Sequence, residues 1–229
     1  MEVKCLGAFN FNIDTLIYRL PAIVLALTVH EYAHGRVAYA FGDPTAKAAG
    51  RLTLNPLAHL DVIGTLALIF LGFGWAKPVP VNPYYFQGNR GRKMMWVSWA
   101  GPLSNLVQAL VVAVLLMISM ITLVFMSAGG SALGMWFINF LDYLILINIV
   151  LAVFNLLPVP PLDGSKILAG LLPERHMNII FSLERYGFII LIIGMYLGIF
   201  SAIIFPIVNA IYGAIISVVY SVFAAMINL

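Results

Sequence analysis

The apolar stretch at residues 15–40 reads TLIYRLPAIVLALTVHEYAHGRVAYA and holds two histidines, His30 and His34, with Glu31 between them. It is long enough to cross the hydrocarbon core of a bilayer, which takes about 20 mostly apolar residues of helix. Residues four apart lie on one face of a helix, so both imidazoles are expected to face the same way. Because ionisable side chains are costly inside a membrane, this stretch is expected to carry a functional site.

The composition of the whole chain agrees with a membrane setting. Hydrophobic residues make up 62% of the 229 residues and charged residues only 9%, whereas soluble domains are about 45–50% apolar and about 25% charged. The net charge is only +3, which leaves no basic patch for a phosphate backbone. These values exclude an ordinary cytosolic domain, a disordered chain and a nucleic-acid binder. Cys5 is the only cysteine, so no intrachain disulfide is possible, and no cleavable signal peptide is expected.

Long stretches with almost no charge predict the remaining membrane spans. Residues 94–157 contain one charged side chain, Asp142, and residues 186–229 contain none. Each block is long enough for two helices, with a turn expected at residues 127–131 in the first and a break near Pro206 in the second. The four further spans are therefore expected at about 94–126, 133–157, 186–204 and 207–228.

The uncharged segment at residues 62–76 is short for a span. Seven of the 12 Lys and Arg lie in residues 36–93 and three lie in residues 158–185, and positively charged loops face the cytoplasm. Both ends of 62–76 then lie on the cytoplasmic side, so we expect a re-entrant segment that dips into the membrane and returns. The alternative is a sixth, short transmembrane helix. With re-entry, the N-terminus lies outside and the C-terminus inside.

Short strands are expected on the cytoplasmic side at residues 51–55 and 77–82, which alternate in polarity and are bounded by prolines. The chain is expected to form one membrane domain over residues 1–229, with a core at about 15–172 and a C-terminal helix pair at about 186–228. The predicted fold is an all-α polytopic membrane protein with five to six transmembrane helices, a re-entrant segment and short β-strands.

The first span carries the pattern of a zinc site. Two imidazoles four residues apart can chelate one Zn²⁺, and Glu31 beside them can act as general base toward a water at the metal. A catalytic zinc takes three protein ligands and leaves one position open, so a third ligand is required. The candidates for the third ligand are Asp163, Asp61, His59, Asp142 and His176.

Asp163 is the favoured third ligand. It follows a span and a stretch with three prolines that turns the chain back along the membrane, so its carboxylate can point into the protein at the depth of the histidines. Asp142 lies toward the opposite end of its span, and His176 lies in a charged loop. His59 and Asp61 lie in a polar loop, where a supporting or structural role is expected, and His59 stays open as a ligand.

An ordered set of motifs resembles those of the site-2 proteases, the intramembrane zinc metalloproteases. HEYAH at residues 30–34 is similar to the HExxH of that family. Four further stretches carry the likeness: NLLPVPPLDG at 155–164, AGPLSN at 100–105, NPLAHLD at 55–61 and GWAKPVPVNP at 74–83. The last two resemble a compact bacterial or archaeal subgroup. The likeness covers about 30–165, and no stretch is long enough for the PDZ or CBS domain that many members carry.

The resemblance implies one zinc ion per chain, held by the two histidines and Asp163, with Glu31 as the catalytic base. It implies that Asn155 orients the substrate or stabilises the oxyanion, and that Asn105 lies near the active site. The alternative for either amide is a hydrogen bond that only holds two helices together. The implied substrates are single-span membrane proteins or signal-peptide remnants, cut in or near their transmembrane segments, with no nucleic acid involved. The implied location is a bacterial or archaeal cell membrane, with the active site open to the cytoplasm.

The mechanism expected from these residues requires the substrate to unwind. A transmembrane helix hides its peptide bonds in backbone hydrogen bonds, so cleavage needs a locally extended segment. The re-entrant segment and residues 77–82 can bind such a segment by strand addition.

Two other classes of function stay open. The first is another membrane zinc peptidase with a glutamate as third ligand, for which the chain offers only Glu174 and Glu184, both in a loop. The second is a protein without activity, either a metal transporter or an inactive relative. A transporter needs several polar groups along a path through its spans, and apart from the motif residues the only charge in the four later spans is Asp142. The presence of Glu31, which is not needed to hold a metal, favours catalysis.

Overall fold

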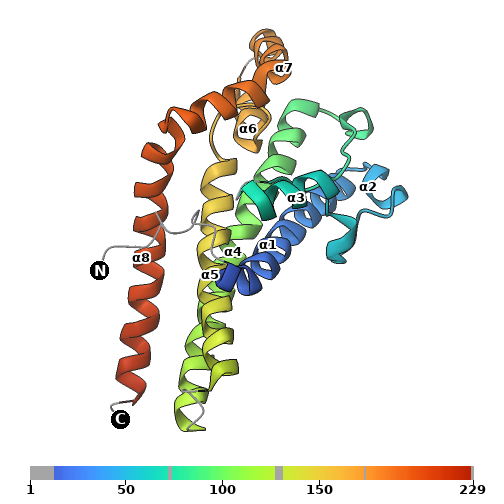
Figure 1. Cartoon of the computed structure of the whole chain (residues 1–229). Coiled ribbons are helices and arrows are strands. Elements are labelled where there is room, and N and C mark those ends of the chain that lie inside the picture. Colours follow the sequence, from blue (N-terminus) through green and yellow to red (C-terminus); the bar gives the residue numbers. More distant parts are fainter. Residues whose placement is uncertain (1–12, 72–73, 127–130, 173, 228–229) are drawn as a thin grey trace.

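The computed structural model describes residues 13–71, 74–126, 131–172 and 174–227, without the side chains of 13–14, 68–71 and 174–184. It is helical almost throughout (Figure 1). The helices are α1 (Ile13–Ala40), α2 (Thr45–Ala48), α3 (Val62–Leu71), α4 (Arg90–Phe125), α5 (Ala132–Asn155), α6 (Asp163–Leu171), α7 (Glu174–Tyr196) and α8 (Ile199–Ile227). Two single 3₁₀ turns lie at Pro56–Ala58 and Pro83–Tyr85.

Four of the described helices are long and apolar enough to cross a bilayer, namely Thr15–Ala40 of α1, α4, α5 and α8. The first three agree with the predicted spans, and the turn expected at 127–131 lies outside the described residues except for Ser131. This serine caps α5 by accepting a hydrogen bond from the backbone N–H of Gly134 at 3.1 Å. The protein is therefore an all-α membrane protein, as predicted.

The two C-terminal helices divide elsewhere than predicted. The break lies at Gly198, which has φ +71°, and Pro206 lies inside α8. Glycine adopts this left-handed conformation without the strain that a Cβ causes, so it ends α7. A proline inside an apolar helix is tolerated where neighbouring helices pack against it. As a result α8 is longer than expected, and the uncharged part of α7, residues 186–196, is shorter than a span.

The segment predicted to be re-entrant forms α3, which has 10 residues. At about 1.5 Å per residue it is only about 15 Å long, half of what a bilayer core requires. Asp61 caps its start by accepting a hydrogen bond from Gly64 N at 2.8 Å. The two ends of the segment meet, because Leu60 and Ala76 form an antiparallel bridge and Lys77 N donates to His59 O at 2.9 Å. The chain thus leaves and returns at the same place, with α3 lying across the direction of the long helices (Figure 1).

The strands predicted at residues 51–55 and 77–82 are not formed. In the described part of the chain, the Leu60–Ala76 bridge is isolated and neither segment belongs to a ladder. Pro78 and Pro80 explain this for the second segment, because a proline has no N–H to donate to a neighbouring strand. The segment is instead held by single bonds to other elements, including Arg51 Nη2 to Lys77 O at 2.6 Å.

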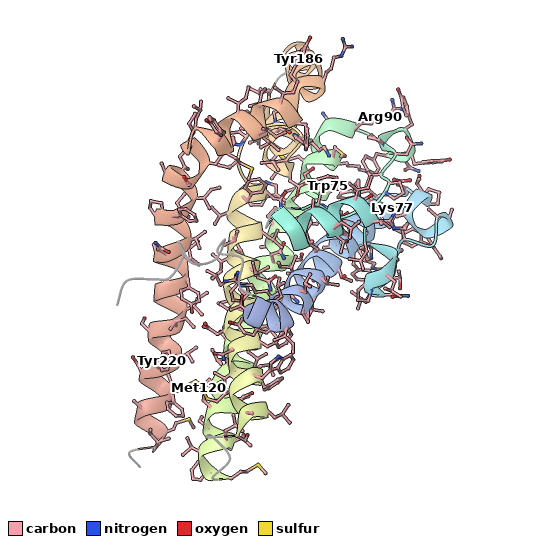
Figure 2. All side chains as sticks on the ribbon, viewed as in Figure 1. Trp75, Lys77, Arg90, Met120, Tyr186 and Tyr220 are labelled. Carbon is pink, nitrogen blue, oxygen red and sulfur yellow. The ribbon has the colours of Figure 1, made fainter. Side chains whose placement is uncertain are left out.

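The helices pack around α4, which contacts α1, α5, α6 and α8. Both α1 and α4 contribute small residues to the buried core, namely Ala22, Ala26, Ala109 and Ala113, and small side chains let helices approach closely in a membrane. Lys77 and Arg90 lie toward one end of the long helices, and Met120 and Tyr220 lie toward the other (Figure 2). The site described next lies where α1, α4 and α6 come together.

Candidate metal centre

Three buried side chains converge between α1 and α6. His30 Nε2 and His34 Nε2 each lie 3.2 Å from Asp163 Oδ2, and the two nitrogens lie 3.0 Å apart. The exposed fractions of the three residues are 4%, 9% and 9%. Within the part of the chain that the structure describes, this is the group of histidine, cysteine and acidic residues that could hold a metal ion.

Local sequence explains how Asp163 reaches the histidines. It is the first residue of α6, and the chain between α5 and α6 turns back through the prolines that follow Asn155. The next residue has to be glycine, because a Cβ at Gly164 would lie 2.3 Å from the carbonyl oxygens of both Leu156 and Leu157. The Asp-Gly pair thus lets the start of α6 pack directly on the end of α5.

Helix α4 packs against the edges of the two imidazoles at Gly101. A Cβ at this position would lie 2.4 Å from His34 Nε2 and 2.6 Å from His30 Cε1. The glycine of the Gly-Pro-x-x-Asn segment therefore leaves the space that the imidazoles occupy.

Hydrogen bonds to the other ring nitrogens determine how the imidazoles are oriented. His30 Nδ1 lies 2.6 Å from Asn105 Oδ1, and His34 Nδ1 lies 2.7 Å from the carbonyl oxygen of Val97. Both partners are acceptors, so each Nδ1 carries a proton and donates it. Each Nε2 then turns its lone pair toward the centre.

The chemistry of this donor set fits a zinc ion. Two nitrogen lone pairs and the carboxylate of Asp163 face one another at about 3 Å, and their mutual repulsion is relieved by a cation. Two histidines and one carboxylate are a known ligand set of catalytic zinc, with the fourth position left open.

The other candidates for the third ligand have different partners. His59 is buried, and its Nε2 bonds to Thr53 O at 2.8 Å. Asp61 caps α3, and Asp142 accepts a hydrogen bond from the Tyr212 hydroxyl at 2.6 Å. The residues Glu174, His176 and Glu184 belong to α7 and not to a loop as expected, and their side chains lie outside the described part of the structure. The tertiary structure thus brings Asp163 to the two histidines and assigns His59, Asp61 and Asp142 to other contacts.

Glu31 is half-buried, and its Oε2 accepts a hydrogen bond from the backbone N–H of Val79 at 2.7 Å. Val79 lies between Pro78 and Pro80, so it is the only one of these three residues with an N–H. The segment 77–82, which returns from α3, therefore runs past the carboxylate next to the candidate metal ligands.

The two candidate asparagines differ in their contacts. Asn105 is fully buried on α4 and accepts the hydrogen bond from His30 described above. Asn155, the last residue of α5, donates to Leu151 O of its own helix at 2.9 Å. The structure therefore places Asn105 against a candidate ligand, and the substrate-orienting role of Asn155 stays a prediction. A further amide, Asn148, lies against Asn105; sequence reasoning missed it, because no motif distinguishes it from other asparagines in apolar helices.

Comparison with known proteins identifies the family. The profile of peptidase family M50 matches residues 117–200. The candidate zinc metalloprotease YwhC of Bacillus subtilis is 40% identical over 204 residues, which are 87% of this chain and 90% of that protein. The chain belongs to peptidase family M50. The resemblance to the site-2 proteases is therefore confirmed, and with it the prediction of a zinc metallopeptidase.

Two more distant relatives carry the same description. The candidate zinc metalloprotease Rip2 of Mycolicibacterium smegmatis is 30% identical over 190 residues, covering 79% of this chain and 67% of that protein. The candidate zinc metalloprotease MJ0611 of Methanocaldococcus jannaschii is 30% identical over 161 residues, covering 69% and 73%. No solved structure matches the chain.

Proposed function

We propose that this chain is an intramembrane zinc metalloprotease that hydrolyses peptide bonds in or near the transmembrane segments of other membrane proteins. The observation that carries the proposal is the convergence of two imidazole lone pairs and a carboxylate inside an apolar helix bundle, with Glu31 adjacent in sequence. Membership of the peptidase family supports the same conclusion.

The proposed mechanism assigns a task to each residue of the centre. His30, His34 and Asp163 hold Zn²⁺, which when bound supplies Lewis acidity toward the attacking water and the scissile carbonyl. Glu31 accepts the proton of the water and passes it to the amine that leaves. The hydrogen bond from Val79 N–H holds one oxygen of the Glu31 carboxylate in place during these transfers.

The extended segment beside Glu31 supports binding of an unwound substrate. Residues 77–82 pass directly over the base and carry two prolines, so they do not pair in a ladder of their own. A substrate segment that lies along residues 77–82 has its backbone next to Glu31, and it would meet mainly carbonyl acceptors there, because Pro78 and Pro80 have no N–H and the Val79 N–H is bonded to Glu31. The substrate class that we propose is single-span membrane proteins and signal-peptide remnants, which can unwind locally at glycine, proline or polar residues.

We further propose that the centre opens to the cytoplasm and that α3 is re-entrant. Two observations support re-entry. The two ends of the segment are bridged at Leu60 and Ala76, and α3 between them is short. The basic residues Lys77 and Arg90, which lie toward the same end of the bundle (Figure 2), support a cytoplasmic position for that end.

The test is cleavage of single-span substrates in proteoliposomes by the wild type and Glu31→Gln, with zinc measured on the same preparations. The wild type is expected to cleave a substrate whose span contains helix-destabilising residues. Glu31→Gln is expected to keep its zinc and to lose about 10²–10⁴-fold in rate, because only the proton acceptor is removed. Asp142→Asn, which changes an intramembrane carboxylate away from the centre, is the control and is expected to keep cleaving.

Two results count against the proposal. Undiminished cleavage by Glu31→Gln places the base elsewhere. If the wild type cleaves none of a panel of such substrates, and membranes of cells with the wild type and Glu31→Gln show the same fragments, the chain is not a protease.

A further inference from the structure

A chain of buried amides links α5 to the metal centre. Asn105 of α4 and Asn148 of α5 both have an exposed fraction of 0%. Burying an amide inside an apolar bundle is costly unless its hydrogen bonds are made. The two amides form one of these hydrogen bonds with each other: Asn105 Nδ2 donates to Asn148 Oδ1 at 2.7 Å.

The bonds on either side of this pair determine which way each amide faces. Asn148 Nδ2 donates to Leu144 O at 2.8 Å, so its oxygen is turned toward Asn105. Asn105 uses its NH₂ group for Asn148 and, at 3.2 Å, for Ala26 O. Its oxygen is thereby left facing His30 Nδ1 at 2.6 Å. The α5 backbone thus orients the Asn148 amide, the Asn148 amide helps to orient the Asn105 amide, and the Asn105 oxygen faces His30.

We propose that Asn148 is a positioning residue for the metal centre: it acts through Asn105 to hold His30 with its Nε2 lone pair toward the metal. The inference rests on the metal centre of the proposed function and adds to it a residue that touches neither metal nor substrate. Without the Asn148 oxygen, one of the two acceptors that hold the Asn105 amide is gone. The amide can then rotate, and the bond that sets the tautomer and the angle of the His30 ring is weakened.

The competing explanation is that Asn148 only bonds α4 to α5. Interhelical hydrogen bonds in membranes contribute to stability by themselves, so a fall in stability does not decide the question. Zinc affinity does, because residues that orient a ligand typically change metal affinity by about 10–100-fold when they are replaced. Since Asn148 acts at one remove, we expect about a tenfold change.

The experiment measures the zinc Kd of purified full-length variants by competition with a chelator of known affinity. Asn148→Leu, which keeps the approximate size, is expected to raise the zinc Kd about tenfold, and Asn148→Asp, which keeps the Oδ1 acceptor, is expected to bind zinc no more weakly than the wild type. Tyr212→Phe is the matched control, because it removes an interhelical hydrogen bond of α5 at Asp142, six residues or about 9 Å along the helix from Asn148 and without contact to Asn105. It is expected to leave the zinc Kd unchanged.

A double-mutant cycle tests whether the effect passes through Asn105. In the background of Asn105→Leu, the Asn148→Leu change is expected to add no further loss of zinc affinity, because the connection is already broken. If Asn148→Leu cannot be purified, Asn148→Ala takes its place in both measurements.

The outcomes separate this inference from the proposed function. A wild type that binds zinc, together with an unchanged Kd in Asn148→Leu, overturns the positioning role alone. Losses that add in the double variant also overturn it, because Asn148 then acts independently of Asn105. A wild type that binds no zinc overturns the inference and the metalloprotease together.

Discussion

The replacement Gly101→Ala tests the geometry of the metal centre by a single methyl group. The new Cβ would lie 2.4 Å from His34 Nε2, 2.5 Å from His34 Cε1 and 2.6 Å from His30 Cε1, whereas ordinary contacts of a Cβ are 3.4–4 Å. The imidazoles and α4 must therefore separate by about 1 Å. Zinc sites accept deviations of only about 0.2 Å in their ligand distances.

The expected consequence is a large loss of zinc affinity in a folded protein. Replacing residues that merely orient ligands costs about 10–100-fold in affinity. Here the ligands themselves are displaced, so we expect a loss of about 100-fold or more, which corresponds to about 2.7 kcal/mol. Helix propensity by itself makes α4 of the variant more stable, since alanine in a helix is favoured over glycine by about 0.5–1 kcal/mol.

The assay combines the zinc Kd, from chelator competition, with helical content from circular dichroism. Gly213→Ala in α8 is the matched control, because a Cβ there meets nothing within 4 Å. It is expected to keep the wild-type zinc Kd. A folded Gly101→Ala protein whose zinc Kd stays within about twofold of the wild type would refute the close packing of α4 on the two imidazoles.

The site and the topology give three further predictions. Asp163→Ala is expected to lose most of the bound zinc, as measured by elemental analysis, and full occupancy in this variant would assign the third ligand elsewhere. Val79→Pro removes the N–H that holds Glu31, so cleavage is expected to fall about tenfold or more with zinc content unchanged; cleavage at the wild-type rate would show that this bond is dispensable. In a chain without its native cysteine, a cysteine at the exposed Asn89 is expected to react with a membrane-impermeant thiol reagent from the cytoplasmic side and one at Leu133 from the other side. Labelling of both from one side would contradict the orientation of α4.

The helical membrane fold and the candidate residues of the metal centre could be predicted from local sequence, while their contacts could not. An apolar stretch longer than about 20 residues defines a spanning helix wherever it occurs, because the bilayer imposes that length. His30 and His34 face the same way because residues four apart lie on one face of any α-helix. The motifs that resemble the site-2 proteases are also short local stretches, so their order along the chain is enough to indicate the family.

The ends of helices were less predictable where both a glycine and a proline could break the helix. The break in the C-terminal helices was expected near Pro206, but it lies at Gly198, which adopts a left-handed backbone conformation. Packing of the surrounding helices decides whether an apolar helix accommodates a proline. The strand expected at 77–82 failed for a related reason, because alternation of side chains does not supply the N–H groups that Pro78 and Pro80 lack.

By itself, the sequence determined that this protein lies in a membrane and that one of its helices presents two imidazoles and a carboxylate. The motif around Asp163 indicated it as the third ligand, but only the tertiary structure places its carboxylate against the two imidazoles and shows which amides contact them. Asp163 reaches His30 across 133 positions of chain, and Asn105 and Asn148 come from two other helices. Contacts of this kind depend on the close approach of α4 and α6 to α1, which Gly101 and Gly164 permit. The spacing of residues along one helix is set by backbone geometry, whereas the choice among distant partners is set by packing between helices.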